Sequence, residues 1–124
     1  YIQKKFNPNI IETLDRLSEL VLDEEDYMQN VTEEAFTEIL IEQENTKIVL
    51  GLKEFNKLEY VIKTRIIMQT TKILFGTSNG IEKKHVEDII KLCGNNIGNK
   101  FLMPNKYYKI SVKGGKVSFE KLSY

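Results

Sequence analysis

The side chains most often used for catalysis are scarce in this sequence. It contains one cysteine, Cys93, and one histidine, His85, so an internal disulfide and a zinc site built from several Cys and His ligands are both excluded. No histidine or asparagine is placed by the sequence to activate Cys93, and its position on the inward face of a predicted helix indicates a packing residue. The acidic run at residues 23–26 lacks the alternating spacing and the glycine of an EF-hand loop, which favours a solvated helix face. The residues alone therefore indicate no reaction centre.

Two polar loops, at residues 76–80 and 94–98, begin and end with glycine. A phosphate-binding P-loop needs clustered glycines between a strand and a helix, followed by Lys-Ser or Lys-Thr, and neither loop has that pattern. Ordinary turns are the prediction for both loops. We therefore expect no catalytic residue, no cofactor site and no metal site in this chain.

Basic side chains are the remaining candidates for function. Arg65 falls at the centre of the apolar stripe of a predicted helix, where a guanidinium must be paired or must point into a polar cavity. One interpretation pairs Arg65 with a carboxylate or with helix-end carbonyls of the acidic half of the chain, and the other places it against phosphate. His85 has two similar interpretations, as a half-exposed packing residue or as an RNA contact. The candidate nucleic-acid contacts are Lys63, Arg65, Lys72, Lys84, His85, Lys100, Lys106 and Lys109.

The predicted C-terminal strands are rich in lysine and tyrosine. A basic β-surface with aromatic side chains suits single-stranded RNA, although basic outer faces of hairpins also serve as ordinary solubility devices. The residues concerned are Lys100, Lys106, Lys109, Lys113 and Lys116, interleaved with Tyr107 and Tyr108.

The net charge of zero conceals an uneven distribution along the 124 residues. Residues 1–44 hold 12 acidic against 3 basic residues, and residues 45–124 hold 6 acidic against 15 basic residues. Such a division suggests that one half faces a polyanion or docks on the other half. Apolar runs are far shorter than the roughly 20 residues of a membrane helix, and no signal peptide is visible, so we expect a cytoplasmic chain without a membrane partner. The first residue is Tyr rather than Met, which suggests a piece of a longer protein.

Periodicity predicts an α+β fold that is mainly helical. Apolar residues at helical spacing indicate two helices in residues 8–44 with a shallow break near residue 30, where Thr32 could cap the second helix, and one long helix is the alternative. Two further helices are predicted at residues 54–75 and 83–93, with Gly94 as the C′ residue of the second. The third helix should bury one apolar face, which contains Leu58, Val61, Ile62, Ile66 and Ile73.

The predicted β-structure is small and antiparallel. Residues 46–50 are β-branched and short, which indicates a strand, and the last segment alternates with a period of two on both sides of Gly114-Gly115. This turn sets Val112 opposite Val117 and Ile110 opposite Phe119. Residues 101–103 could add a third strand ended by a turn at residues 104–105. We therefore expect about four helices and a C-terminal hairpin or three-stranded sheet.

One compact domain with three parts is the expected organisation. These parts are an acidic helical segment at residues 1–45, a helical core with a short leading strand at 46–94, and a β-hairpin region at 95–124.

Several segments carry residue patterns of a known protein family. FNPNIIETLDRL at residues 6–17 and DEEDYM at 23–28 resemble the stretch that follows the catalytic domain in the family of bacterial tRNA(Ile)-lysidine synthetases. Residues 58–65, the Lys84-His85-Val86 entry to a helix, and GNKFLMPN at 98–105 are similar to its following helix pair and strand. Lys106 departs from the pattern, since the family often has glycine there. The similar segments occur in the family's order along nearly the whole chain.

The resemblance implies a part of an ATP-dependent ligase that adenylates cytidine 34 of an isoleucine tRNA and joins lysine to it. The family's Ser-Gly-Gly-x-Asp-Ser ATP loop is absent from this sequence. ATP and Mg²⁺ are therefore expected in a separate catalytic domain, and this chain would be a non-catalytic part that positions tRNA. The implied partners are isoleucine tRNA with a CAU anticodon and the catalytic domain of the same polypeptide, with a homodimer left open.

The residues themselves also allow a winged-helix DNA-binding module. In that alternative, residues 83–93 form the recognition helix and the Gly114-Gly115 hairpin forms the wing. The helix offers only Lys83, Lys84, His85 and Lys91 as contacts, without the Arg, Asn or Gln that usually read base edges.

Overall fold

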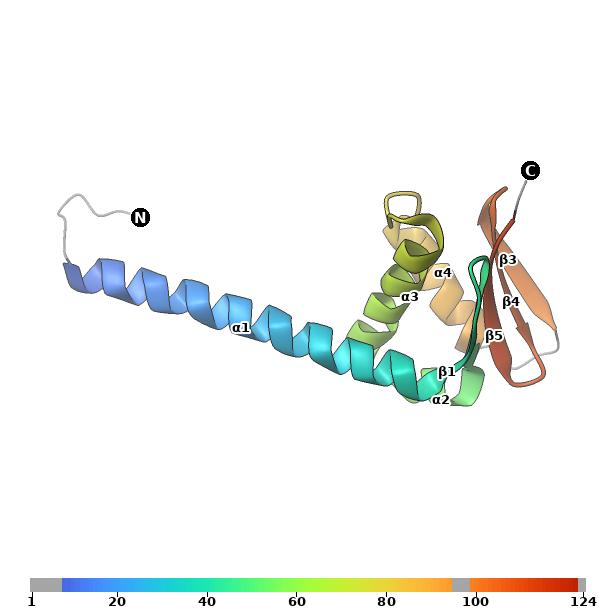
Figure 1. The fold of residues 1–124 in the computed structure, drawn as a ribbon, viewed down its shortest axis with the longest axis horizontal. Coiled ribbons are helices and arrows are strands. Elements are labelled where there is room, and N and C mark those ends of the chain that lie inside the picture. Colours follow the sequence, from blue (N-terminus) through green and yellow to red (C-terminus); the bar gives the residue numbers. More distant parts are fainter. Residues whose placement is uncertain (1–7, 95–98, 123–124) are drawn as a thin grey trace.

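A single long helix, α1 (Pro8–Ile39), begins the described part of the chain. The computed structural model describes residues 8–94 and 99–122, and in α1 it describes side chains from Asp23 onward. The expected break near residue 30 is wrong, because the Thr32 hydroxyl donates back to the Met28 carbonyl inside the helix, at 2.7 Å, instead of capping a new one. Neither glycine nor proline occurs between Pro8 and Gly51, so the sequence contains no strong helix breaker in this stretch. Figure 1 shows α1 projecting from the rest of the molecule, which it joins near its C-terminal end.

A short hairpin of two strands follows α1. The predicted strand is found as β2 (Lys47–Gly51), and it pairs antiparallel with β1 (Leu40–Gln43), which the sequence did not predict. Leu40 continues the apolar spacing of α1, and the sequence therefore predicts it to be helical. In the structure it faces Leu50 across the hairpin.

The third predicted helix is two helices. The chain forms α2 (Leu52–Asn56), turns through residues 57–59, and continues as α3 (Tyr60–Phe75). This turn allows Phe55 and α3 to contribute to one core. Gly76, with φ of 80°, ends α3 in the left-handed conformation that glycine adopts most easily.

The buried face of α3 differs from the predicted one. Ile62 and Ile66 are buried as expected, but Val61 and Ile73 are 45% and 43% exposed. Ile67, Leu74 and two threonines, Thr70 and Thr71, are buried instead. The inward face is therefore rotated away from the predicted stripe, and it includes two polar residues that apolar spacing alone does not indicate.

The fourth helix is found as α4 (Lys83–Gly94). Val86, Ile89 and Cys93 are buried as predicted, and Ile90 is partly buried. Gly94 is the last helical residue and does not have a positive φ, so the prediction of a C′ glycine there is wrong.

The C-terminal hairpin forms in the predicted register. β4 (Tyr108–Lys113) pairs with β5 (Lys116–Lys121), with Ile110 opposite Phe119 and Val112 opposite Val117. Gly114 and Gly115 have φ of 59° and 77°, the positive values that a two-residue turn of this kind requires. β3 (Lys100–Asn105) adds a strand, but it runs through Pro104 with a bulge, and the turn lies at residues 106–107 instead of 104–105.

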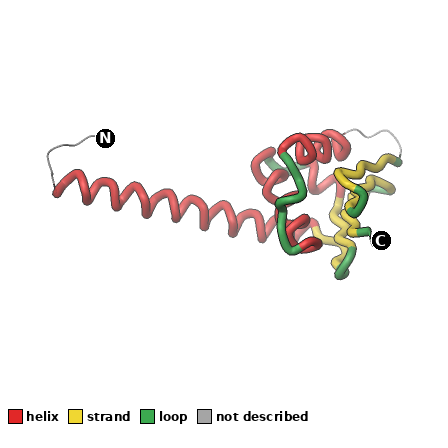
Figure 2. Tube along the Cα trace, turned by 90° about the horizontal axis from the view of Figure 1, so that it is seen from above, coloured by secondary structure: helices red, strands yellow, loops and turns green. Residues whose placement is uncertain are grey.

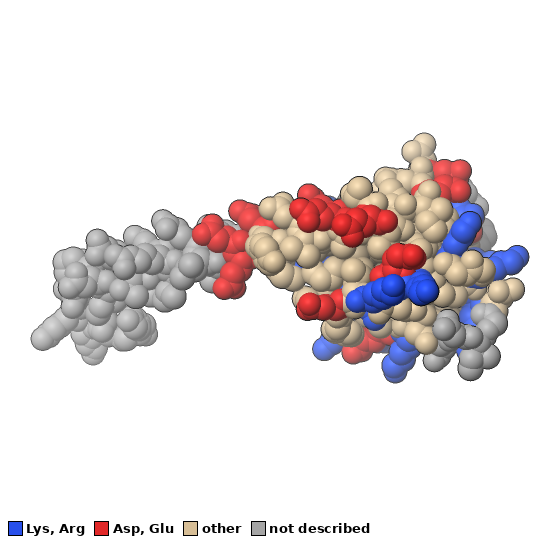
Figure 3. Space-filling view, turned by 90° about the horizontal axis from the view of Figure 1, so that it is seen from below, with Lys and Arg blue, Asp and Glu red and all other residues tan. Residues whose placement is uncertain are grey.

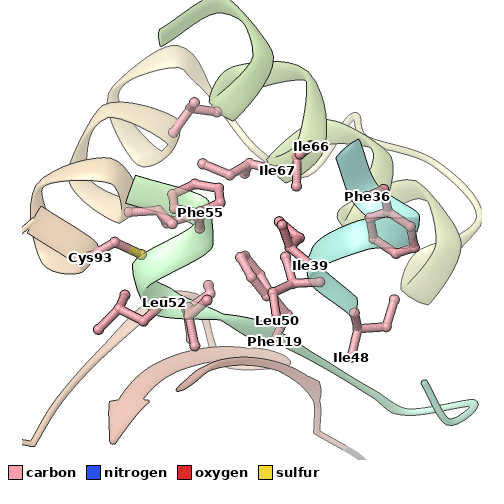
Figure 4. Close-up of a cluster of buried hydrophobic side chains, with 14 of the residues drawn as sticks. Phe36, Ile39, Ile48, Leu50, Leu52, Phe55, Ile66, Ile67, Cys93 and Phe119 are labelled. Carbon is pink, nitrogen blue, oxygen red and sulfur yellow. The ribbon is translucent and has the colours of Figure 1, made fainter. Parts of the chain in front are cut away.

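All the strands form one five-stranded antiparallel sheet with the order β1-β2-β5-β4-β3. It is larger than the predicted hairpin or three-stranded sheet because β2 pairs with β5, far along the chain. The helices gather on one side of this sheet (Figure 2). Figure 4 shows the core between them, where Leu50 and Phe119 of the sheet meet Phe55 of α2 and Ile39 of α1. The fold is α+β, as predicted.

Candidate nucleic-acid interface

The face of the sheet that points away from the helices carries basic side chains. Ile110 and Val112 of β4 are buried against the helices, so the alternating residues Lys109, Ser111 and Lys113 lie on the opposite face. Lys113 faces Lys116 of β5 across the hairpin end, and both are exposed. We call this surface the open sheet face; its cations on β4 and β5 are Lys109, Lys113 and Lys116.

The register brings polar and basic residues of three strands side by side on the open sheet face. Lys109 faces Glu120 of β5, and Glu120 faces Lys47 of β2 on its other side. Ser111 faces Ser118. The single carboxylate in this row offsets part of the positive charge, but the hairpin end has none directly opposite its two lysines.

Phe101 is the aromatic residue of the open sheet face. It faces Ser111, its side chain is 62% exposed, and the Lys109 ammonium lies 5.0 Å from the centre of its ring. The sequence indicated Tyr107 and Tyr108 as the interleaved aromatics, but Tyr108 points into the core and is 1% exposed. The register of β3 explains the position of Phe101. Its neighbour Leu102 pairs with the inward-facing Ile110, so Phe101 points to the opposite face of the sheet.

The other two lysines of the β3–β4 region lie beside the open sheet face and not on it. Lys100 faces Val112, on the side of the sheet that carries the helices, and its side chain is exposed at the start of β3. Lys106 is in the β3–β4 turn, with its ammonium 5.2 Å from the ring centre of the half-exposed Tyr107.

Arg65 joins the basic half of the chain to the acidic half. Its guanidinium donates two hydrogen bonds to the Glu25 carboxylate of α1, each of 3.1 Å. This contact lowers the pKa of Glu25, chiefly through the hydrogen bond and then through the positive charge, and it raises the pKa of Arg65. The guanidinium is therefore paired with a carboxylate, as one of the two interpretations expected. It is not buried, because the Arg65 side chain is 28% exposed.

Arg65 also lines a groove of about 270 Å³ between α1, α3 and the loop after α3. Lys72, two helical turns further along α3, lines the same groove. Lys63 does not line it, and its ammonium lies 6.0 Å from the ring centre of Phe55. The structure therefore brings Arg65 and Lys72 together and separates Lys63 from them.

Lys84 and His85 lie in the first turn of α4. The Nδ1 atom of His85 accepts a hydrogen bond from the Glu82 backbone N–H, at 3.0 Å. Glu82 directly precedes the helix, so His85 satisfies one of the free N–H groups there, in the way the third helical residue does in a capping box. This contact gives His85 a structural role that its sequence position alone did not reveal. Lys84 is exposed next to it.

Cys93 is fully buried, as expected of a packing residue, and burial raises the pKa of its thiol to about 12. Within residues 23–94 and 99–122, no three His, Cys, Asp or Glu side chains are grouped closely enough to hold a metal ion. None of the described helices is both long enough and apolar enough to span a membrane.

The charges of the described residues are separated in space. In Figure 3, acidic side chains dominate near α1, and most of the visible basic side chains lie toward the globular end. A polyanion would therefore be repelled by α1 and attracted to the remainder of the molecule.

The sequence is similar to several curated proteins, although no model of a known protein family matches it. It is 31% identical over 102 residues to the tRNA(Ile)-lysidine synthase of Clostridioides difficile, which covers 82% of this chain and 22% of that protein. It is 32% identical over 119 residues to the tRNA(Ile)-lysidine synthase of Clostridium perfringens, covering 91% of this chain and 25% of the relative. The tRNA(Ile)-lysidine synthase of Clostridium acetobutylicum is 33% identical over 105 residues, which cover 85% of this chain and 22% of that protein.

These matches agree with the resemblance carried by the residue patterns. The chain spans about a quarter of the length of the curated relatives it matches. It therefore belongs, as a segment related to part of those proteins, to the tRNA(Ile)-lysidine synthase family.

Proposed function

We propose that this chain is a non-catalytic part of a tRNA(Ile)-lysidine synthetase that holds isoleucine tRNA in the cytoplasm while a separate catalytic domain of the same polypeptide acts on it. That domain would adenylate cytidine 34 of the CAU anticodon with ATP and join lysine to it. The observation that carries the proposal is the open sheet face, where Lys109 lies beside the exposed ring of Phe101 and where Lys113 and Lys116 add positive charge at the hairpin end. The family similarity supports tRNA as the polyanion.

The chemistry of the open sheet face suits an RNA backbone better than base recognition. Lysine ammonium groups are compact charges that neutralise phosphates, whereas the planar arginine fork is the usual reader of base edges. The chain has only two arginines, and Arg65 is engaged by Glu25. We infer that this part supplies affinity and orientation and that the choice of nucleotide is made elsewhere.

The described residues do not fit ATP with Mg²⁺. The loop at residues 77–80 follows a helix and not a strand, and it has no Lys-Ser or Lys-Thr pair after its glycine. The described residues also contain no cluster of carboxylates for a metal ion. This supports placing the ligase chemistry in another domain.

The surface of α4 argues against the winged-helix alternative. Its exposed side carries Glu87 and Asp88 among the lysines, and these acids would face the phosphates of a duplex. A recognition helix normally presents a surface free of such repulsion.

A charge-matched pair of variants tests the proposal. In the first variant, Lys109, Lys113 and Lys116 of the open sheet face are changed to Gln. In the control, three exposed lysines of α2, its C-terminal cap and α4 are changed in the same way, namely Lys53, Lys57 and Lys91. Both variants lose the same net charge, so only the location differs.

Binding of isoleucine tRNA and of duplex DNA of similar length is then measured by competition at matched salt. We expect a wild-type slope of log affinity against log salt of about −3 to −4, and a loss of about two units of that slope in the open-sheet variant. Its tRNA affinity should fall by about tenfold or more, with little change in the control. A preference for the duplex, or an equal loss in both variants, would contradict the proposal.

A further inference from the structure

The open sheet face carries an accessible aromatic ring at one of its edges. Phe101 belongs to β3, which ends the strand order β1-β2-β5-β4-β3, so no other described strand lies on its outer side. Its side chain is 62% exposed, and Met103, on the other side of the half-buried Leu102, is 39% exposed. A ligand that approaches the sheet from solvent can therefore reach the ring of Phe101.

The residues next to Phe101 on the open sheet face are small. Phe101 faces Ser111 of β4, and Ser111 faces Ser118 of β5, so the ring and two short hydroxyl side chains follow one another across three strands. Because serine side chains are short, the surface beside the ring is lower than the ring itself. A flat group can rest against the ring above the two serines without displacing a long side chain.

Positive charge lies on both sides of this row. Lys109 and Lys113 are two residues before and two residues after Ser111 on β4, so their backbones are about 13 Å apart with the row between them. Glu120 faces Lys109 and offsets part of its charge, whereas Lys113 faces another cation, Lys116. The arrangement suits a ligand whose flat part has a negative charge on each side, as a nucleotide within a strand has.

The contact between Lys109 and Phe101 leaves room for such a ligand. The ammonium lies 5.0 Å from the centre of the ring, and a cation over one face of a ring leaves its other face available. Proteins that hold single strands combine stacking of bases on aromatic side chains with cations along the backbone. In a duplex, the bases are stacked on one another and paired, so their flat faces cannot reach a side chain on a protein surface.

We propose that the open sheet face binds an unpaired RNA segment, with one base stacked on Phe101 and the flanking phosphates near Lys109 and Lys113. RNA as the partner rests on the proposed function, and the restriction to unpaired nucleotides goes beyond it. Every base has a flat face, so stacking on Phe101 accepts any of the four bases. This agrees with a surface that has lysines and no arginine for reading base edges.

Substitutions at Phe101 separate stacking from simple apolar contact. Phe101→Leu keeps an apolar side chain but removes the flat aromatic face. The chain has no tryptophan, so Phe101→Trp retains a flat ring and also introduces a single fluorescent reporter at the site. Tyr60, which is 55% exposed at the start of the helix α3, provides the matched controls Tyr60→Leu and Tyr60→Trp.

Binding is measured at one salt concentration with three probes. These are a single-stranded oligouridylate, an abasic oligomer of the same length, and an RNA duplex with the same number of phosphates. We expect the oligouridylate to bind about fivefold or more tighter than either of the other two. Phe101→Leu should weaken oligouridylate binding by about fivefold or more and duplex binding by less than twofold, whereas Tyr60→Leu should change neither.

Fluorescence reports the stacking directly. The emission of the Phe101→Trp variant should be quenched by the oligouridylate but not by the abasic oligomer, and its affinity should equal or exceed that of the wild type. The emission of the Tyr60→Trp variant should not change.

The inference is overturned if Phe101→Leu weakens oligouridylate and duplex binding equally, if the abasic oligomer binds as tightly as the oligouridylate, or if the Phe101→Trp emission does not respond. Isoleucine tRNA separates this inference from the proposed function. If tRNA binding requires the lysines of the open sheet face but Phe101→Leu affects neither tRNA nor the oligouridylate, this inference fails alone. If the oligouridylate binds as described and tRNA does not bind, only the proposed function fails.

Discussion

The phenol oxygen of Tyr108 and the hydroxyl oxygen of Thr71 lie 2.9 Å apart inside the core, joining β4 to α3 across 37 residues of sequence. The Thr71 hydroxyl also donates to the Ile67 carbonyl oxygen, at 2.8 Å. The ring of Tyr108 packs edge-on against Phe75, with centroids 4.8 Å apart. One tyrosine therefore contributes both a hydrogen bond and an aromatic contact between the sheet and the helices.

Changing Tyr108 to Phe should cost about 1 kcal/mol of unfolding free energy, because the ring contacts remain and one buried hydrogen bond is lost. Tyr60→Phe is the control, since Tyr60 is 55% exposed. Urea denaturation of both variants measures the difference. Equal stability of the two variants would show that the Thr71–Tyr108 contact contributes nothing.

Alkaline pH should destabilise the protein through two buried groups. Burial raises the pKa of the Cys93 thiol from 9.0 to about 12, and burial also raises the pKa of Tyr108 above its ordinary value of 10.0. The folded state keeps protons that the unfolded state releases, so their stabilising contribution is complete below pH 9 and is lost as pH rises toward the folded-state values. The loss from Cys93 is up to about 1.4 kcal/mol per pH unit in that window.

Unfolding free energies measured between pH 8 and pH 11 check this prediction. The Cys93→Ala variant should lose less stability over the range than the wild type, whatever its stability at pH 8. An identical pH dependence in the two proteins would contradict the assignment to Cys93.

Changing Arg65 to Ala should have only a small effect on stability, because the ion pair with Glu25 is accessible to solvent and screened by salt. We expect a decrease in melting temperature of less than about 4 °C. The lowered pKa of Glu25 means that its contribution is present above the ordinary value of 4.5 and is lost as pH falls below it. The melting temperatures of the variant and of the wild type should therefore differ at pH 7 and become equal at low pH, where Glu25 is protonated.

The His85 side chain should act as a capping group at the start of α4, and glutamine should be able to replace it. His85→Ala should destabilise the protein by about 0.5–2 kcal/mol, whereas His85→Gln should recover part of this loss, since glutamine serves at the same position of a capping box. Lys84→Ala controls for general effects in the same turn. Chemical denaturation provides the measurement, and failure of Gln to recover any stability would argue against capping.

The turn between β4 and β5 should tolerate asparagine better than a β-branched residue. Gly114 and Gly115 have positive φ, and space around each is open, so the cost of substitution is backbone strain alone. Gly114→Asn should be nearly neutral and Gly114→Val should cost about 1–2 kcal/mol. Gly80→Val, at a glycine without positive φ, is the control, and melting temperatures distinguish the three variants.

Local patterns were sufficient for the parts of the fold whose determinants are adjacent in sequence. The β4–β5 hairpin follows from the alternation around two glycines, and its register is confirmed residue by residue. The pairing of β2 with β5 depends on a contact between Ile48 and Phe119, which no local pattern encodes. The five-stranded sheet was therefore only partly predictable.

The same distinction applies to α3 and to the candidate sites. Apolar spacing placed Arg65 in the middle of a buried stripe, but the inward face of α3 is rotated, includes the buried Thr70 and Thr71, and leaves Arg65 beside the groove. The sequence placed the lysines of β4 and β5 on predicted strands, whereas the outward position of Phe101 could be inferred only from the β3 register. Polar residues that pack inward and strands that pair over long distances are the two features that apolar periodicity cannot reveal.

The length of α1 has a mechanical consequence. Its 32 residues extend over about 48 Å, and among its described side chains only those from Met28 onward pack against the core. Because packing begins at Met28, a tilt of about 10° at that residue displaces Pro8, roughly 30 Å away along the helix, by about 5 Å. A small change of angle in the packed part of α1 therefore becomes a displacement of several ångströms at its N-terminal end.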